Sequence, residues 1–187
     1  LHLCDYNLEK MVRTSTTKHD LLAEVCMAAK YEGDSIKTRY TPYQQKYGDS
    51  QICTELARSF ADIGDIIRGK DLYRGDKEKN QTEREKLEER LKTIFAKIHS
   101  EVTNGKNRLA LQERYKGDEA NNFFKLREDW WTANRQEIWK AITCHAGESD
   151  KYFRQTCSNG GSYAYKQCRC KGDQVPTYFD YVPQYLR

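Results

Sequence analysis

The spacing of apolar residues predicts a chain that is made mainly of helices. Residues three or four positions apart lie on one face of a helix, and four segments repeat their apolar side chains at that spacing. The four stripes comprise Leu21, Val25 and Ala28; Ile52, Leu56, Phe60, Ile63 and Ile67; Leu87, Leu91, Ile94, Ile98 and Val102; and Phe124, Trp131 and Ile138, which Trp139 and Ile142 extend. Gly64 interrupts the second stripe, where glycine costs about 1 kcal/mol relative to alanine. It therefore predicts the close approach of a neighbouring helix.

Capping residues and glycines predict where these helices begin and end. The segment Thr17–Asp20 can cap the first helix, and Gly33 is expected to end it in a left-handed conformation. Gly69 is expected to end the second helix. The third helix is expected to begin at the capping box Thr82–Glu85 and to end at Asn104–Gly105.

All three tryptophans lie between Arg127 and Cys144, and this segment is the predicted centre of the core. Large aromatic side chains at helical spacing need burial, and truncating one to alanine costs about 3 kcal/mol or more. A core helix that begins near Asp118 is favoured over an aromatic cofactor-binding box. The polar residues within the helix are expected to face water: Arg127, Glu128, Asp129, Asn134, Arg135, Gln136, Glu137 and Lys140.

Composition and charge narrow the classes of function. The mean hydropathy is −0.97 and the net charge is +4, which is too small to indicate a nucleic-acid partner. No apolar run approaches the roughly 20 residues of a membrane span, and no signal peptide precedes the first helix. Because Leu1 follows no initiator methionine and the chain stops at Arg187, we expect it to be a piece of a larger protein.

One basic segment is a candidate ligand-binding site. Its four cations are interrupted only by Glu113, and such a cluster could bind a sulfated glycan with strong salt dependence. The cations are Lys106, Arg108, Arg114 and Lys116. The alternative is a basic helix end that has no ligand.

Seven cysteines indicate an oxidising, extracellular setting. They are Cys4, Cys26, Cys53, Cys144, Cys157, Cys168 and Cys170. Their scatter through a polar chain favours disulfides, and the odd count leaves one thiol free or paired elsewhere. A zinc site that draws on Cys144, His145, Cys157, Cys168 and Cys170 is the alternative. The chain has no CxxC pair, and a one-residue gap between two cysteines suits a tetrahedral ion poorly, so disulfides are favoured.

The segment after Gly147 differs from the rest of the chain. It has a turn-rich stretch at residues 157–161 and many aromatic residues: Tyr163, Tyr165, Tyr178, Phe179, Tyr181 and Tyr185. We expect a disulfide-tied cap over the helix ends, with a last helix near Pro183, because proline is tolerated in a first helical turn.

The histidines do not indicate an enzyme. His2, His19, His99 and His145 lie far apart in the sequence, and none stands beside a recognisable nucleophile. No cofactor and no catalytic residue are expected. The two remaining classes are an extracellular adhesion module and a non-adhesive helical scaffold that cysteines or zinc stabilise.

Three long motifs carry a resemblance to a known family. They are the segment Cys53–Arg74, the helix REDWWTANRQEIWKAITC and the segment Val175–Arg187; the opening LHLCDYNLEKM and the helix HDLLAEVCMAAKYEG match as well. Together they resemble the Duffy-binding-like domains, most closely the alpha class, of the Plasmodium falciparum erythrocyte membrane protein 1 family. The resemblance implies a mainly α, disulfide-linked helical bundle with a small irregular N-terminal subdomain. Residues 1–48 would belong to the first subdomain and residues 49–187 would form the second, while the third would be absent.

The resemblance also implies a function and partners. It implies an adhesion module of a variant surface antigen on the infected erythrocyte, with the membrane anchor outside this chain and with no enzymatic activity. The expected partners are a host cell-surface receptor or a sulfated or blood-group glycan, as in rosetting or cytoadherence. Host antibodies and adjacent adhesion domains of the same parent chain are expected as well, whereas nucleic acid is not.

The family likewise implies how the cysteines pair. Cys4 would pair with a cysteine upstream of this chain, and Cys53 with Cys168 or Cys170. Cys26 and Cys144 would pair among the remaining cysteines, with the connectivity left open.

Overall fold

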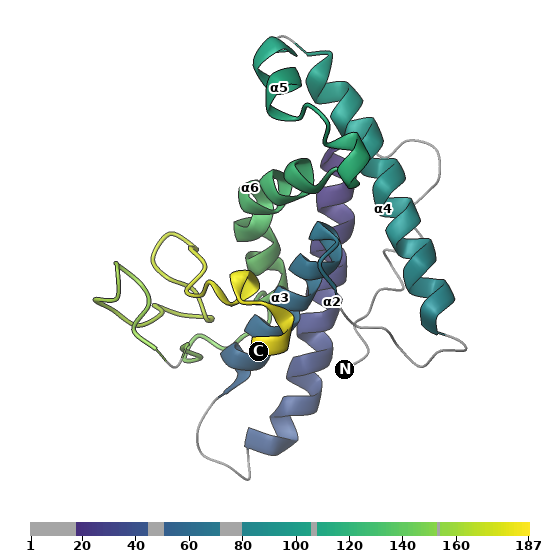
Figure 1. Cartoon of the computed structure of the whole chain (residues 1–187). Helices are drawn as coiled ribbons and strands as arrows, with labels where there is room; N and C mark the ends of the chain where they lie inside the picture. Colours follow the sequence, from purple (N-terminus) through teal and green to yellow (C-terminus); the bar gives the residue numbers. More distant parts are fainter. Residues whose placement is uncertain (1–17, 45–50, 72–79, 106–107, 153) are drawn as a thin grey trace.

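The computed structural model describes residues 18–44, 51–71, 80–105, 108–152 and 154–187 (Figure 1). Its helices are α2 (Lys18–Gln44), α3 (Ile52–Arg68), α4 (Asn80–Thr103), α5 (Arg108–Arg114) and α6 (Phe124–Ile142), with short 3₁₀ turns at Glu119–Asn121, Phe179–Tyr181 and Gln184–Leu186. Over these ranges the only β-structure consists of two isolated bridges, Cys157 with Ser162 and Lys166 with Arg169. The predicted mainly α, disulfide-linked fold is confirmed.

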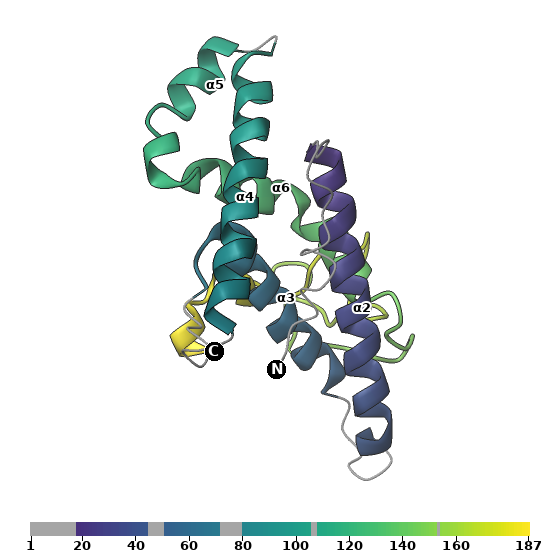
Figure 2. The same cartoon turned by 90° about the vertical axis from the view of Figure 1, so that its right-hand side faces the viewer.

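The core forms where α2, α3 and α6 pack against one another (Figures 1 and 2). The Phe60 ring lies between two tryptophans, with its centroid 5.1 Å from that of Trp131 and 5.0 Å from that of Trp139. All three side chains are fully buried. The tryptophan-rich segment is therefore a core helix, as its spacing predicts.

Two glycines let neighbouring helices approach α6. A Cβ atom on Gly64 would lie 2.8 Å from the Trp131 ring, which confirms the predicted close approach. A Cβ atom on Gly33 would clash with the carbonyl oxygen of Ile142. The predicted end of the first helix at Gly33 is wrong, because α2 continues to Gln44 and this glycine serves packing. Gly69 does end α3, in the left-handed conformation that the sequence predicts.

α6 begins six residues later than predicted, and Asp118 explains why. Asn122 and Phe123 adopt left-handed conformations with φ of 55° and 60°, which separates the preceding 3₁₀ turn from α6. The buried carboxylate of Asp118 accepts hydrogen bonds from the N–H groups of Lys125 and Leu126, both at 2.9 Å. It thereby satisfies donors that a helix N-terminus leaves without partners, from outside the helix.

Two arginines of α6 are not on the solvent face where the sequence places them. Arg127 is 2% exposed and donates hydrogen bonds to the carbonyls of Ile66 and Ile67, at the end of α3. Its guanidinium also pairs with Glu88 of α4 at 2.7 Å. Arg135 is largely buried and pairs with Asp180. Arg127 thus supplies donors to the last turn of α3, where the Ile66 carbonyl also accepts from the Gly69 N–H, and it joins three helices.

The C-terminal segment, residues 147–187, packs over α3 and α6 (Figure 1). Asp180 is fully buried and accepts hydrogen bonds from the Trp131 indole at 2.8 Å and from the Arg135 guanidinium at 2.8 and 2.9 Å. Arg68 of α3 donates to the backbone carbonyl of Asp180. One short 3₁₀ turn follows Pro183, where the sequence predicts a last helix.

Two disulfides tie this segment together. Cys53 of α3 pairs with Cys168, which is one of the two partners that the resemblance implies, and Cys157 pairs with Cys170. These pairings remove three of the five candidate zinc ligands. Cys4 lies outside the described residues.

The bridges that the resemblance implied for Cys26 and Cys144 are absent, and both thiols are free. Cys26 lies near Glu137 of α6, and burial together with this carboxylate raises the pKa of Cys26 to about 11. Cys144 instead lies beside Asp34, which is eight residues further along α2. Eight helical residues span about 12 Å, whereas the Cα atoms of a disulfide lie within about 7 Å of each other.

The predicted subdomain boundary at residues 48 and 49 lies outside the described residues, as do residues 1–17 of the predicted N-terminal subdomain. α2 nonetheless contributes to the same core as α3 and α6. Among the described residues, every helix is too short or too polar to span a bilayer.

Candidate binding surface

An open cleft of about 750 Å³ lies between α5 and the first turns of α6. α5 projects at one end of the molecule, beyond the packed helices α2, α3 and α6 (Figures 1 and 2). The cleft is lined by Ala110, Glu113, Arg114, Phe124, Lys125, Glu128 and Asp129. We refer to these seven residues as the α5–α6 cleft.

A bidentate ion pair crosses the cleft. The guanidinium of Arg114 donates two hydrogen bonds of 2.7 Å to the two carboxylate oxygens of Asp129. The Tyr115 hydroxyl donates a third hydrogen bond to Asp129, at 2.9 Å. This geometry fixes the orientation of both side chains on α5 and α6.

The ion pair shifts the pKa values of its members. The hydrogen bonds from Arg114 lower the pKa of Asp129 below its usual range, so that the carboxylate is charged at neutral pH. Burial and the hydrogen bond to Asp129 raise the pKa of Tyr115. The charge of Arg114 is therefore largely balanced within the cleft.

Phe124 is exposed in the cleft, although its heptad spacing predicts burial. Its side chain is 44% exposed, and the Lys70 ammonium lies 5.1 Å from its ring centroid. Phe124 is the first residue of α6, one turn before the position where Arg127 reaches the end of α3. The apolar stripe of α6 thus begins about one turn before the part of α6 that α3 covers. The Phe124 ring therefore faces solvent.

The four predicted basic residues have different places in the structure. Arg114 lines the cleft in its ion pair, and Lys116 is exposed in the turn that follows α5. Arg108 is the first residue of α5, but its side chain is outside the described part, and Lys106 is outside it altogether. Of the two whose side chains the structure describes, it brings Arg114 to the cleft.

Sequence reasoning missed most of the cleft, including Phe124, Lys125, Glu128 and Asp129. The spacing of α6 places Asp129 on its polar face, but no sequence period encodes its pairing with Arg114, 15 residues earlier. The finished cleft has two basic and three acidic side chains around one aromatic ring. Such a surface offers an apolar contact together with several hydrogen-bond donors and acceptors.

The model of the Duffy binding domain family matches residues 1–187, the whole chain. The chain belongs to the Duffy binding domain family. Among the curated proteins compared with it, none matches.

Solved structures of Duffy-binding-like domains share the fold. One is the N-terminal NTS-DBL1-alpha and CIDR-gamma double domain of the PfEMP1 protein from the Plasmodium falciparum varO strain. It is 40% identical, with a TM-score of 0.79 over 99% of this chain and 25% of that chain. Another is the ICAM-1-binding PfEMP1 IT4var13 DBLbeta domain, which is 33% identical with a TM-score of 0.69 over 100% of this chain and 39% of that one.

The same DBLbeta domain bound to ICAM-1 is 32% identical, with a TM-score of 0.66 over 99% of this chain and 40% of that chain. This Duffy binding domain thus spans a quarter to two fifths of the solved chains that it resembles. Duffy-binding-like domains of PfEMP1 are adhesion modules.

Proposed function

We propose that this Duffy binding domain is an extracellular adhesion module of a variant parasite antigen on the infected erythrocyte. Its target is a host cell-surface receptor or glycan. The observation that carries the proposal is the likeness, at about one third identity, to a DBLbeta domain solved in complex with ICAM-1. Host antibodies and neighbouring adhesion domains of the parent chain are further partners in this proposal.

The α5–α6 cleft is the surface that we assign to adhesion. Aromatic and arginine side chains carry much of the binding energy at protein interfaces. Phe124 and Arg114 supply one of each, at the end of the molecule where α5 projects (Figure 1). Their partners Lys70 and Asp129 hold both side chains in place before binding, which lowers the entropic cost of association.

A sulfated glycan is the ligand class that the basic segment favours. Asp129 already pairs with Arg114, so attraction of sulfate depends mainly on Lys106, Arg108 and Lys116. Exposed charges of this kind are screened by salt over about 10 Å at 0.1 M ionic strength. Retention on heparin is therefore expected to fall steeply as the salt concentration rises.

Charge reversal tests whether the basic segment binds a sulfated glycan. Arg108→Glu combined with Lys116→Glu is expected to move heparin elution to markedly lower salt. Lys151→Glu combined with Lys171→Glu is the matched control, because it changes the net charge equally in the C-terminal segment, away from α5. Equal retention of the two double variants would count against the basic segment as a glycan site.

A receptor panel tests adhesion itself. The chain with both disulfides formed is passed over immobilised host surface proteins, including ICAM-1, and over sulfated and blood-group glycans. Saturable binding to at least one of them is expected. Failure to bind any of them would favour the non-adhesive scaffold.

A further inference from the structure

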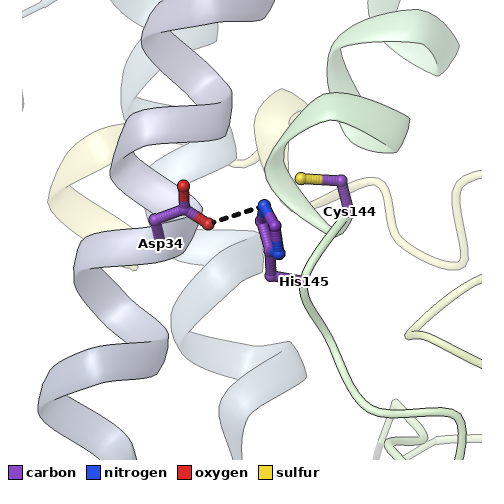
Figure 3. Close-up of side chains that lie close together, drawn as sticks. All are labelled: Asp34, Cys144 and His145. Carbon is purple, nitrogen blue, oxygen red and sulfur yellow. Dashed lines mark ion pairs between the residues drawn. The ribbon is translucent and has the colours of Figure 1, made fainter.

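Three potential metal ligands converge where α2 passes the end of α6 (Figure 3). Asp34 comes from α2, while Cys144 and His145 come after Thr143, the residue that caps the end of α6. The Nε2 atom of His145 lies 3.1 Å from an Oδ atom of Asp34. The carboxylate oxygen, the imidazole nitrogen and the Cys144 Sγ atom all lie within 4.8 Å of one another.

The core of the protein holds these residues together. Gly33 lies against the carbonyl of Ile142, in a contact too close for any side chain at residue 33. Asp34 is the next residue of α2, and Cys144 comes two residues after Ile142. The same helix contact that requires a glycine therefore sets Asp34 beside Cys144 and His145.

The three donor atoms match the preferences of Zn²⁺. Zinc binds cysteine sulfur at about 2.3 Å, and histidine nitrogen and carboxylate oxygen at about 2.0–2.2 Å, usually in a tetrahedron. In such a tetrahedron the nitrogen and oxygen ligands lie about 3.3 Å apart, close to the separation of Asp34 and His145. Cys144 is free to act as a ligand because it is outside both disulfides.

We propose that Asp34, Cys144 and His145 bind one Zn²⁺ ion, with a fourth position open to water or to a donor from another molecule. When the zinc bonds form, the Cys144 thiol releases its proton to solvent, and His145 gives up the Nε2 proton that faces Asp34 in the metal-free state. The thiolate and the Asp34 carboxylate then balance the two charges of the metal. The ion pair between Asp34 and His145 is the metal-free state of the same site.

The neighbours of the site set a limit on its affinity. Burial and the Asp34 carboxylate raise the pKa of the Cys144 thiol, while the nearby cations Lys30 and Arg169 act in the opposite direction. Both cations favour the thiolate and disfavour the metal ion. His145 and Asp34 are also 48% and 40% exposed at their side chains, so the site exchanges metal with solvent.

Titration with Co²⁺ tests the site in the chain with both disulfides intact. Cobalt in a tetrahedral site with a thiolate ligand gives a sulfur-to-metal charge-transfer band and visible d–d bands. One equivalent is expected to saturate them, and Zn²⁺ is expected to displace the cobalt. Cys144→Ser is expected to abolish the charge-transfer band, and Asp34→Asn or His145→Gln to weaken binding by about tenfold or more.

Matched controls separate this site from adventitious binding. Cys26→Ser removes the other free thiol of the described residues, and His19→Gln removes an exposed histidine at the start of α2. Both variants are expected to keep the bands and the affinity of the unaltered chain. A charge-transfer band that survives Cys144→Ser, or no saturable uptake by the unaltered chain, would overturn the proposal.

A second measurement needs no variant and so does not depend on variant folding. Alkylation of Cys144 in the unaltered chain is followed by mass spectrometry of its peptide, with and without Zn²⁺. Zinc is expected to slow the alkylation of Cys144 and to leave that of Cys26 unchanged. Equal rates at Cys144 with and without zinc would contradict a zinc–sulfur bond, as would the absence of a free thiol at this residue.

Discussion

Gly33 and Gly64 lie in helix interiors, where glycine is unfavourable, and both face α6. In each case the neighbouring atoms are too close for a side chain. The close packing that glycine permits therefore stabilises the protein by more than the low helix propensity of glycine costs. The sequence reveals the role of Gly64, because apolar residues of one helical stripe flank it on both sides. Gly33 has no such context and resembles a helix end, which is why the sequence places the end of the first helix wrongly.

Gly64→Ala is expected to lower the free energy of unfolding by about 1–3 kcal/mol. The new Cβ atom would lie 2.8 Å from the fully buried Trp131 ring, which cannot move without disturbing Phe60. Urea unfolding measures the loss. Gly105→Ala is the control, since its Cβ atom would meet no atom nearer than 3.5 Å, and a loss as large there would contradict the packing explanation.

Arg114→Gln is expected to raise the pKa of Asp129 towards the usual aspartate value near 3.9. In the folded protein this pKa is lowered, so the ion pair stabilises the fold above the unfolded-state pKa. The contribution is lost as the pH falls through the folded-state pKa. An NMR titration of the Asp129 carboxyl carbon measures the change. Lys116→Gln, the same loss of charge two residues later, is expected to leave the pKa as it is.

At the level of helices, the apolar stripes predict the existence of α2, α3, α4 and α6, and they locate the core. They predict the ends less well, because an end depends on tertiary contacts. The residues that set the start of α6 and satisfy the end of α3 are Asp118 and Arg127. From the sequence, Asp118 is expected at a helix start and Arg127 on a solvent face. In the structure, each charged side chain is buried against the backbone of another element.

Asp118→Ala is expected to destabilise the protein by about 1–2 kcal/mol, the usual cost of losing a helix cap. The N–H groups of Lys125 and Leu126 would lose their acceptor. Hydrogen exchange at these two amides should quicken more than exchange near Trp139. Unchanged exchange at Lys125 and Leu126 would show that Asp118 does not hold the start of α6.

At the scale of the whole molecule, the two disulfides differ in the length of chain that they enclose. The Cys53–Cys168 bridge joins residues 115 positions apart and fixes the C-terminal segment to α3, whereas Cys157–Cys170 spans 13 positions within that segment. The resemblance left two possible partners for Cys53, namely Cys168 and Cys170. It did not give the free state of Cys26 and Cys144, because Cys144 lies beside Asp34, eight residues from Cys26 along α2, and this distance depends on the helix continuing past Gly33.

Replacing Cys53 and Cys168 together with alanine is expected to destabilise the fold more than replacing Cys157 and Cys170. Chain-entropy estimates give about 4–5 kcal/mol for a loop of the first size and about 3 kcal/mol for the second. Denaturant unfolding of the two double variants under the same conditions measures the order. A reversed order would mean that the long bridge does not restrain the unfolded chain as proposed.

The cleft between α5 and α6 could not be predicted as a site, because it forms only when Arg114 meets Asp129 and when α6 extends beyond α3. The basic segment of the sequence points to the same end of the molecule. The proposed role of the cleft in adhesion therefore depends on residues that the sequence places in the core or on a solvated face. Phe124 is the clearest example.

Binding of Phe124→Ala to the host molecule selected by the receptor panel is the most direct test of the adhesion surface. Leu109→Ala is its control, because Leu109 is an exposed apolar residue of α5 that does not line the cleft. Loss of a central aromatic contact is expected to weaken binding by about tenfold or more, with the control unchanged. Equal affinity of Phe124→Ala and the unaltered chain would contradict the assignment of adhesion to this cleft.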